Sequence, residues 1–348
     1  MNISEILTKA VEMKASDVHL TAGRPPLFRL LGDLHAQEQW KMLLPPDTEA
    51  LCREMFTPRL SDEMDGQGQV DFAYGLAGLG RFRVNVFKQR NSFCAAIRVI
   101  NPEIASLEEL NLPPVVGELA RRPRGMVLVT GPTGSGKSTT LASMIDLVNM
   151  EYKKHILTLE DPIEFLHKHK NCIVNQREIG TDTHSFSDGL RAGLREDPDV
   201  ILVGEMRDPE TISIAVTAAE TGHLVLTTLH TSSAAQTVER IIDVFPPHQQ
   251  QQIRVQLAST IQGVISQTLL KRADGKGRIA AAEILIGTPA VRNLIREGKT
   301  HQLNSMIQTG GQYGMQSLDS TLRKMIQEGR ILMKEALAQN ANFQAQSI

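Results

Sequence analysis

The pattern of apolar and polar residues changes near residue 110. Before that point it is mixed, and the alternation of polar and apolar residues over 81–87 is typical of a half-buried strand. The other elements predicted here are a short helix over 2–14 and strands at 18–20, 27–31 and 95–100, the last as partner of 81–87. The first part of the chain is therefore expected to be a mixed α/β unit.

From about residue 115, short apolar runs alternate with amphipathic stretches. The amphipathic stretches predict helices around 186–194 and 212–219. This alternation predicts a parallel sheet that is covered by helices on both faces. After about residue 245 the pattern predicts mostly helix. The apolar runs predict buried strands at 126–130, 155–159, 200–203 and 224–229.

A hinge between two domains is indicated by Asn111-Leu112-Pro113-Pro114. The length of 348 residues is also typical of two domains. We therefore expect an α/β protein in which an N-terminal domain over 1–112 is linked to a second domain over 113–348. The second domain is expected to have a parallel-sheet core and a helical C-terminal part.

A phosphate-binding pattern, G-x-x-x-x-G-K-[ST], follows the predicted strand 126–130 and precedes a predicted helix. Strand, glycine loop and helix form the context that the motif requires, because the helix dipole and backbone N–H groups then face the same anion. Lys137 is expected to reach the β- and γ-phosphates, and Ser138 to bind Mg²⁺. The residues expected to contact the nucleotide are Gly131, Pro132, Thr133, Gly134, Ser135, Gly136, Lys137, Ser138 and Thr139.

Two acidic segments narrow the reaction to hydrolysis. Val200 to Val203 and then Gly204-Glu205 form a Walker B-like strand, in which Gly204 replaces the usual Asp and Glu205 must act alone on Mg²⁺. Three carboxylates also cluster over 160–164. Because hydrolysis needs a group that orients and deprotonates water, Glu164 is our candidate base, while Glu160 and Asp161 are interpreted as turn residues and contacts to Mg²⁺-bound water.

Histidines and arginines supply further candidates. His230 ends the predicted strand 224–229, where an imidazole could sense the γ-phosphate. His223 lies seven positions earlier, on the opposite face of a strand, so the two are not expected to share a metal. The segment 167–170 is interpreted as a basic solvated loop. A ring-forming nucleoside triphosphatase needs arginines from a neighbour. The candidates are Arg191 and Arg195, on one predicted helix face, and Arg81, Arg83, Arg98 and Arg207.

Composition argues against several other classes of protein. The net charge of −2 gives no global field that attracts nucleic acid or anionic lipid, and an aromatic content of 4% argues against a base-stacking surface. Cys52, Cys94 and Cys172 are odd in number and far apart, which argues against a disulfide framework or a cysteine zinc site. With no signal-peptide core and no apolar run long enough to span a membrane, the chain is expected to be a reduced cytosolic protein.

Together these segments resemble the PilT family, the type IV pilus retraction ATPases of the secretion ATPase superfamily. The resemblance covers nearly the whole chain and includes Ala15-Ser16-Asp17-Val18-His19-Leu20 in the first domain. Its most specific part is the segment 290–297, which is similar to the retraction signature AIRNLIRE with Val291 in place of isoleucine. We expect a short helix there, with Val291, Leu294 and Ile295 buried and Arg292 and Arg296 on its polar side.

The resemblance implies a PAS-like N-terminal domain, a RecA-like ATPase domain, and a homohexameric ring with ATP held between the domains. It implies that Glu164 is the catalytic base and that Glu205 acts with Mg²⁺. It also implies that Arg83 and Arg98 complete the site and that Arg191 and Arg195 act across the interface. The expected location is cytoplasmic, at the inner membrane. There the ring would turn a membrane platform protein and depolymerise the pilus, which drives twitching motility.

Several alternatives were weighed. An accessory retraction paralogue (PilU-like) is the alternative within the family, and such a paralogue could also be a partner. A RecA-like DNA motor needs a basic, aromatic-bearing surface, and the sequence shows none, so no nucleic-acid partner is expected. A GTPase switch normally carries an N-K-x-D motif, which is absent. A non-catalytic nucleotide-binding protein should lack a water-positioning acid, whereas Glu164 and Glu205 are both present.

Overall fold

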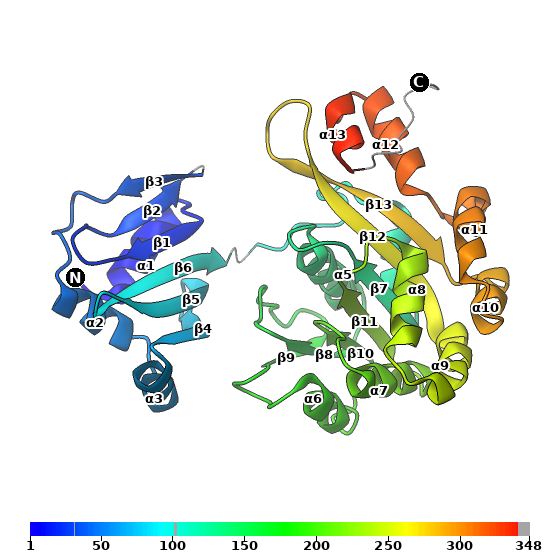
Figure 1. Cartoon of the computed structure of the whole chain (residues 1–348), viewed down its shortest axis with the longest axis horizontal. Coiled ribbons are helices and arrows are strands. Elements are labelled where there is room, and N and C mark those ends of the chain that lie inside the picture. Colours follow the sequence, from blue (N-terminus) through cyan, green and yellow to red (C-terminus); the bar gives the residue numbers. More distant parts are fainter. Residues whose placement is uncertain (31, 101–102, 340–348) are drawn as a thin grey trace. The chain divides into compact units, whose positions relative to one another are not determined.

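The computed structural model describes residues 1–339 except residues 31 and 101–102 (Figure 1). The chain forms two compact units, which consist of Met1–Glu103 with Pro162–Leu166 and of Ile104–Asp161 with His167–Ile348. The sequence placed the domain boundary after residue 112. The units divide earlier because Leu107, Leu110 and Leu112 pack into the hydrophobic core of the second unit.

The first unit combines an antiparallel sheet with three helices. Its helix α1 begins at a capping box between Asn2 and Glu5 and buries one face against the sheet. The six strands lie in the order β3-β2-β1-β6-β5-β4. The helices are α1 (Ile3–Glu12), α2 (Pro45–Arg53) and α3 (Pro58–Gln67), and the strands are β1 (Asp17–Leu20), β2 (Leu27–Leu30), β3 (Asp33–Ala36), β4 (Gln69–Leu76), β5 (Gly80–Gln89) and β6 (Ser92–Ile100).

The predicted alternation over 81–87 is confirmed in β5. Phe82, Val84 and Val86 are fully buried, whereas Arg83 between them is exposed. The predicted pairing with 95–100 is also confirmed, since β5 pairs with β6 in antiparallel register. Strands β3 and β4 were not predicted. Leu31, the last residue of the predicted strand 27–31, lies outside the described residues.

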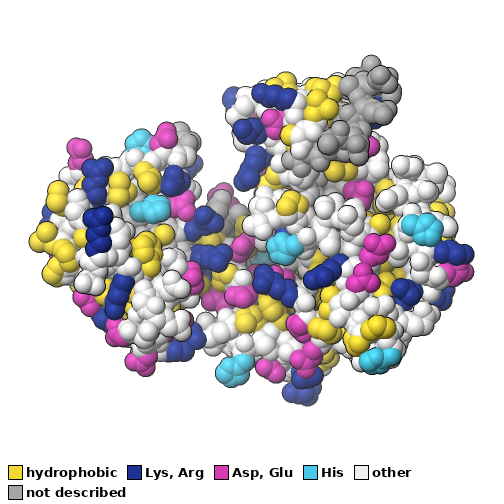
Figure 2. Space-filling view, in the orientation of Figure 1, with side chains coloured by type: hydrophobic (Ala, Val, Ile, Leu, Met, Phe, Trp, Pro, Cys, Tyr) yellow, Lys and Arg dark blue, Asp and Glu magenta, His cyan; other side chains and the backbone are white. Residues whose placement is uncertain are grey.

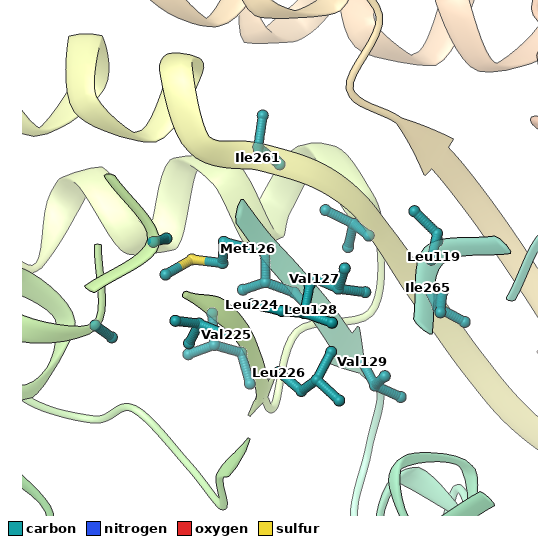
Figure 3. Close-up of a cluster of buried hydrophobic side chains, with 14 of the residues drawn as sticks. Leu119, Met126, Val127, Leu128, Val129, Leu224, Val225, Leu226, Ile261 and Ile265 are labelled. Atoms are coloured by element: carbon teal, nitrogen blue, oxygen red, sulfur yellow. The ribbon is translucent and has the colours of Figure 1, made fainter. Parts of the chain in front are cut away.

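The second unit is built on a seven-stranded sheet in the order β13-β12-β7-β11-β10-β8-β9. Its strands are parallel except for the β12–β13 pair. Buried side chains of β7, β11 and β12 form the centre of its core (Figure 3). Four of the strands, β7 (Gly125–Thr130), β8 (His155–Glu160), β10 (Val200–Val203) and β11 (Leu224–Leu229), confirm the predicted apolar runs, and β9 (Ile173–Glu178) was missed.

Helices connect these strands as the alternating pattern predicted. The predicted helices around 186–194 and 212–219 are confirmed in α6 and α7. Such βα alternation gathers the carboxyl ends of the parallel strands at one edge of the sheet, where phosphate sites form in sheets of this kind. The connecting helices are α4 (Pro114–Ala120), α5 (Lys137–Glu151), α6 (Phe186–Gly193), α7 (Pro209–Glu220), α8 (Ala234–Asp243) and α9 (Pro247–Thr260).

The prediction of mostly helix after residue 245 is wrong for the hairpin of β12 (Ile261–Lys271) and β13 (Arg278–Ile286). Helix α9 runs directly into β12 without a turn residue, and an apolar run by itself does not distinguish a strand from a buried helix. Helices α12 and α13 pack on the hairpin through Leu322, Met325 and Ala336. The remaining helices are α10 (Pro289–Arg296), α11 (Leu303–Thr309), α12 (Leu318–Gln327) and α13 (Met333–Gln339), with short 3₁₀ turns at Thr300–Gln302 and Gly311–Tyr313.

The surface carries charges of both signs. On the face shown in Figure 2, Lys and Arg side chains are interspersed with Asp and Glu side chains, in keeping with the net charge of −2. None of the helices in the described part of the chain has the length and apolarity needed to cross a bilayer. Cys52, Cys94 and Cys172 are buried as free thiols, and burial raises the pKa of Cys52 to about 12.

Protonation of His167 is expected to destabilise the protein at acid pH. Burial of the imidazole lowers the pKa of His167 from 6.5 to about 4. Between these values the unfolded chain binds a proton that the folded chain does not. The contribution is therefore complete above pH 6.5 and is lost as the pH falls towards 4, by roughly 1–3 kcal/mol. Melting temperatures measured over this range should fall more steeply for the wild type than for His167→Gln.

A variant of an exposed histidine, His301→Gln, serves as the control for this measurement. Its melting temperature should follow the wild-type pH dependence, since the imidazole of His301 is in water in both states. Parallel pH curves for the wild type and His167→Gln would show that His167 does not cause the acid sensitivity.

Candidate functional site

The phosphate loop joins the buried strand β7 to helix α5, as the motif requires. Helix α5 begins at Lys137, and its N-cap residue Gly136 has a left-handed φ of 89° and makes no side-chain cap hydrogen bond. The N–H groups of the first turn are thus not capped by the N-cap side chain, and they lie at the positive end of a 15-residue helix. This is the arrangement that binds phosphate.

The loop itself leaves no space for larger residues at its start. A Cβ atom on Gly131, whose φ is 142°, would lie 2.2 Å from the carbonyl oxygen of Gln267 on β12. Within the described part of the chain, the buried hydroxyl oxygen of Ser135 has no hydrogen-bond partner. A buried hydroxyl of this kind, inside a loop of N–H donors, fits a phosphate oxygen as its partner.

Lys137 is buried and is held by the loop. Its Nζ atom donates to the carbonyl oxygens of Gly131 at 2.8 Å and Pro132 at 3.0 Å, and it lies 3.5 Å from Nδ1 of His230. Ser138, the next residue, is exposed. The ammonium group is therefore already at the loop, beside a hydroxyl that could bind Mg²⁺.

Three neighbouring strands bring the acidic and histidine segments to the same edge. Val203 on β10 pairs with Thr227 on β11, so Glu205 and His230 follow adjacent strand ends. Nε2 of His230 lies 3.6 Å from a carboxylate oxygen of Glu205. Because Nδ1 of the same ring faces Lys137, the structure places Lys137, His230 and Glu205 in one row.

Gly204 explains why no second carboxylate precedes Glu205. A Cβ atom on Gly204 would lie 3.1 Å from the carbonyl oxygen of Leu159 and 3.4 Å from Cα of Glu160. Its own N–H donates to Leu159 O at 2.8 Å, and its carbonyl accepts from the hydroxyl of Thr228. An aspartate here would require the neighbouring main chain to give by a few tenths of an ångström, and Glu205 is the acid that follows Gly204 at this strand end.

Two cavities flank these residues. The first, of about 480 Å³, is lined by Glu205, Arg207, His230 and Arg240. The second, of about 330 Å³, lies next to Gly136 and Thr139. Its walls are apolar at Leu112, Leu269 and Ile279, with polar groups from Asn111, Gln267 and Arg278, a mixture that suits a nucleoside.

Apart from Gly136 and Thr139 of the predicted phosphate-binding segment, the sequence did not indicate the residues of the second cavity. Gln267, Leu269 and Arg278 lie on β12 and β13, which were expected to be helical, and only the tertiary fold brings them to the loop. One signal was present in the sequence. Asn111 has a left-handed φ of 56°, and Asn before Leu-Pro-Pro is a usual residue for such a turn.

The acidic segment divides between the two units. Glu160, at the end of β8, accepts hydrogen bonds from the hydroxyl of Thr158 at 2.6 Å and from Nε2 of Gln176 at 3.1 Å. Asp161 is exposed. Glu164 belongs to the short segment 162–166, which groups with the first unit. The second unit by itself therefore does not supply this candidate base to the phosphate loop.

The predicted arginines also divide between the units. Arg191 on α6 forms an ion pair with Glu210, but α6 ends at Gly193, so Arg195 lies in the following turn rather than on the same helix face. This corrects the prediction that the two share a helical face. The turn is stabilised by a hydrogen bond from the Arg195 N–H to the carbonyl of Ala192.

In the first unit, Arg83 and Arg98 lie directly opposite each other on β5 and β6. Both side chains are exposed, and Arg98 donates to Asp17 at 3.2 Å. Within the described part of the chain, no ion pair involves Arg83. Like charges that face each other across a sheet are destabilising, which suits a pair that binds an external anion.

Helix α10 differs from its prediction in two residues. Val291 and Ile295 are fully buried as expected, but Leu294 is only half-buried. Arg292 is half-buried rather than solvated, because its Nη2 donates to the carbonyl oxygen of Ile261 at 3.0 Å. Burial lowers the pKa of Arg292, and the nearby Arg122 and Arg296 add to this effect. Of the two arginines of α10, Arg296 is the exposed one.

Comparisons with known proteins extend this geometry. The model of the type II/IV secretion system protein family matches residues 1–338. The chain is 50% identical to the type IV pilus retraction ATPase PilT of Pseudomonas aeruginosa, over 97% of each chain. It is 40% identical to the type IV pilus ATPase PilU of the same organism, over 97% of this chain and 88% of PilU. A crystal structure of the pilus retraction motor PilT with bound ADP is similar, with a TM-score of 0.92, 49% identity, and coverage of 100% of this chain and 99% of that one.

Proposed function

The chain belongs to the type II/IV secretion system protein family, and we propose that it is an ATP-hydrolysing motor that drives type IV pilus retraction and twitching motility. One observation carries the proposal. Lys137, His230 and Glu205 come from three separate segments and meet at the phosphate loop. The chain that carries them has 49% sequence identity to a pilus retraction motor with bound ADP.

The second unit supplies the groups that bind the nucleotide. The uncapped N–H groups of α5 and the ammonium of Lys137 face the position of the phosphates, and the 330 Å³ cavity beside Gly136 receives the nucleoside. Lys137 exchanges its bonds with loop carbonyls for bonds to phosphate oxygens. Because the site is partly buried, its donors stabilise the charge that develops on phosphate more strongly than water does.

The residues present fit a divalent cation next to the loop. The exposed hydroxyl of Ser138 and the carboxylate of Glu205 would hold Mg²⁺, which neutralises phosphate charge when it is bound. Arg207 donates to Oε2 of Glu205 at 2.9 Å, and Nε2 of His230 lies 3.6 Å from the same oxygen. These two contacts hold that carboxylate oxygen in place.

Glu164 is proposed as the general base that orients and deprotonates the attacking water. Arg83 and Arg98 of the first unit, with Arg191 and Arg195 from a neighbouring subunit, are proposed to complete the site around the phosphates. This assignment requires a homohexameric ring that holds ATP between domains. Arg83 supports it, since this arginine lies opposite Arg98, is exposed, and forms no ion pair with another of the described residues.

The proposed partner is an inner-membrane pilus platform protein, which the ring would turn from the cytoplasmic face of that membrane. A paralogous retraction ATPase is a second proposed partner, and an accessory role is the alternative for this chain. The higher identity to PilT, 50% against 40% to PilU, supports the principal motor.

ATP turnover of the purified full chain, with its assembly state followed by light scattering with and without ATP·Mg²⁺, tests this proposal. Turnover in a ring is the expected result, followed by restored twitching in a strain that lacks its retraction ATPase. A ring that binds ATP but never hydrolyses it would favour the accessory role. If the chain neither binds nor hydrolyses ATP, the proposed function is overturned.

Exposed side chains of α10 are expected to be needed for pilus retraction rather than for ATP hydrolysis. Arg296→Ala should leave ATP turnover within about twofold of wild type, because the side chain is exposed and lies outside both cavities, but it should abolish retraction. Turnover of the purified variant and twitching of the complemented strain measure the two effects.

The matched control is Lys324→Ala on α12, which removes another exposed positive charge from the second unit. Both turnover and retraction should stay normal in this control. Normal retraction by Arg296→Ala would show that the exposed side chain of Arg296 on α10 is not needed for retraction.

A further inference from the structure

We propose that Gln267 is a positioning residue that fixes the phosphate loop for nucleotide binding. Gln267 lies on β12 with 3% of its surface exposed. Its Nε2 donates to the carbonyl oxygen of Ser135 at 2.8 Å, and its Oε1 accepts from the hydroxyl of Thr140 at 2.9 Å. These partners stand on either side of Gly136 to Thr139. One amide therefore joins the end of the loop to the first turn of α5.

The main chain of Gln267 supports the loop as well. Strand β12 runs parallel to β7, and Ser266 pairs with Thr130, so Gln267 and Gly131 are the next residues along the two strands. A Cβ atom on Gly131 would meet Gln267 O at 2.2 Å, and one on Gly136 would meet Gln267 Nε2 at 3.2 Å. The loop is thus packed on Gln267 at both of its ends.

The energetic reason is the burial of the amide. If the loop moved away, a buried donor and a buried acceptor would lose their partners, which costs more than two ordinary hydrogen bonds contribute. Gln267 therefore holds the loop N–H groups in place before the anion arrives. Binding then needs less ordering of the loop, and preorganisation of this kind increases affinity.

Although Gln267 lines the nucleoside cavity, its Nε2 contacts the loop and its Oε1 contacts the first turn of α5. If Gln267 recognised the base, its substitution would weaken the binding of one nucleotide more than that of another. If Gln267 positions the loop, its substitution affects the binding of the phosphates. The affinity for ADP, GDP and pyrophosphate should then fall by the same factor. The two roles therefore predict different binding profiles.

The experiment is calorimetric titration of the full-length protein with ADP, GDP and pyrophosphate. Gln267→Met keeps the length of the side chain but removes the amide, and it should weaken binding of all three about tenfold. The matched control is Gln262→Met on the same strand, whose Nε2 donates to Arg124 O at 3.1 Å, away from the loop. This control should bind all three as the wild type does.

A second variant separates a loop effect from a general loss of stability. Thr140→Val removes only the hydroxyl that Gln267 accepts from, and it should weaken pyrophosphate binding while the melting temperature stays near that of Gln262→Met. The double variant Gln267→Met/Thr140→Val should bind little more weakly than Gln267→Met alone, because both changes break the same contact. If Gln267→Met does not fold, the affinity of Thr140→Val for pyrophosphate tests the positioning role of Gln267.

Unchanged pyrophosphate binding in both single variants would overturn the positioning role, as would a loss confined to ADP or to GDP. The inference rests on the proposed nucleotide site, and the wild-type titration tests that site separately. Failure of the wild type to bind ADP and pyrophosphate would overturn the site itself. Wild-type binding with unaffected variants would overturn only the role of Gln267.

Discussion

Lys137→Ala is expected to reduce ATP hydrolysis by at least ~10²-fold and to weaken nucleotide binding. The ammonium of Lys137 is buried at the loop, where low polarity strengthens its attraction to phosphate, and alanine offers no replacement for it. The substitution also frees the carbonyl oxygens of Gly131 and Pro132, which the ammonium now contacts, so the loop loses two internal hydrogen bonds. Steady-state turnover and titration with ADP measure the two effects.

The matched control is Lys153→Ala. Lys153 is exposed just beyond the end of the same helix, at the opposite end from the loop, so it tests the loss of one positive charge without a change at the site. Its turnover should equal that of the wild type. Near-normal turnover by Lys137→Ala would reject the assigned phosphate site, because the ammonium of Lys137 is the positive charge held at the loop itself.

Glu164→Gln is expected to bind ATP with nearly normal affinity but to hydrolyse it at least ~10²-fold more slowly, the scale of losing a general base. Glutamine keeps the shape of the side chain and its hydrogen-bonding oxygen but does not take a proton from water at neutral pH. Rapid-quench measurement of a single turnover separates the chemical step from product release and from ATP binding.

Two further variants test the choice of Glu164 over its neighbours. Asp161→Asn changes an exposed acid in the same segment, and its effect on turnover should be much smaller than that of Glu164→Gln because Asp161 is interpreted as a turn residue and a contact to Mg²⁺-bound water. Glu160→Gln changes a carboxylate that already accepts from Thr158 and Gln176, so its effect should be smaller than that of Glu164→Gln. A larger loss in Glu160→Gln than in Glu164→Gln would move the base to Glu160.

Much of the site was predictable because its signals are local in the sequence. The phosphate loop needs a strand, a glycine-rich turn and a helix in immediate succession, and all three lie within residues 125–151. The Walker B-like strand ends in Glu205 and the next strand in His230, and parallel neighbours bring such ends together. Lys137, His230 and Glu205 therefore come together because each follows the carboxyl end of a strand and these strands are neighbours in the sheet.

The errors in prediction concern residues whose positions depend on distant parts of the chain. Arg292 was expected on a polar helix face, but its guanidinium reaches the main chain of Ile261 where α9 becomes β12. Arg195 was expected on α6, but the helix ends at Gly193, where a Cβ would meet Cδ2 of Leu157 at 2.3 Å. Periodicity along one helix does not report either contact.

The sequence by itself determined the α/β class, the four central strands of the second unit, the phosphate loop and the family. Apolar periodicity and glycine spacing act within a few residues and leave a readable pattern. Only the tertiary structure decided that β12 lies beside β7, and with it the contact of Gln267 with Ser135 and Thr140. The physical reason is that these residues are over a hundred positions apart along the chain, so the burial of a shared sheet edge, rather than any local preference, brings them together.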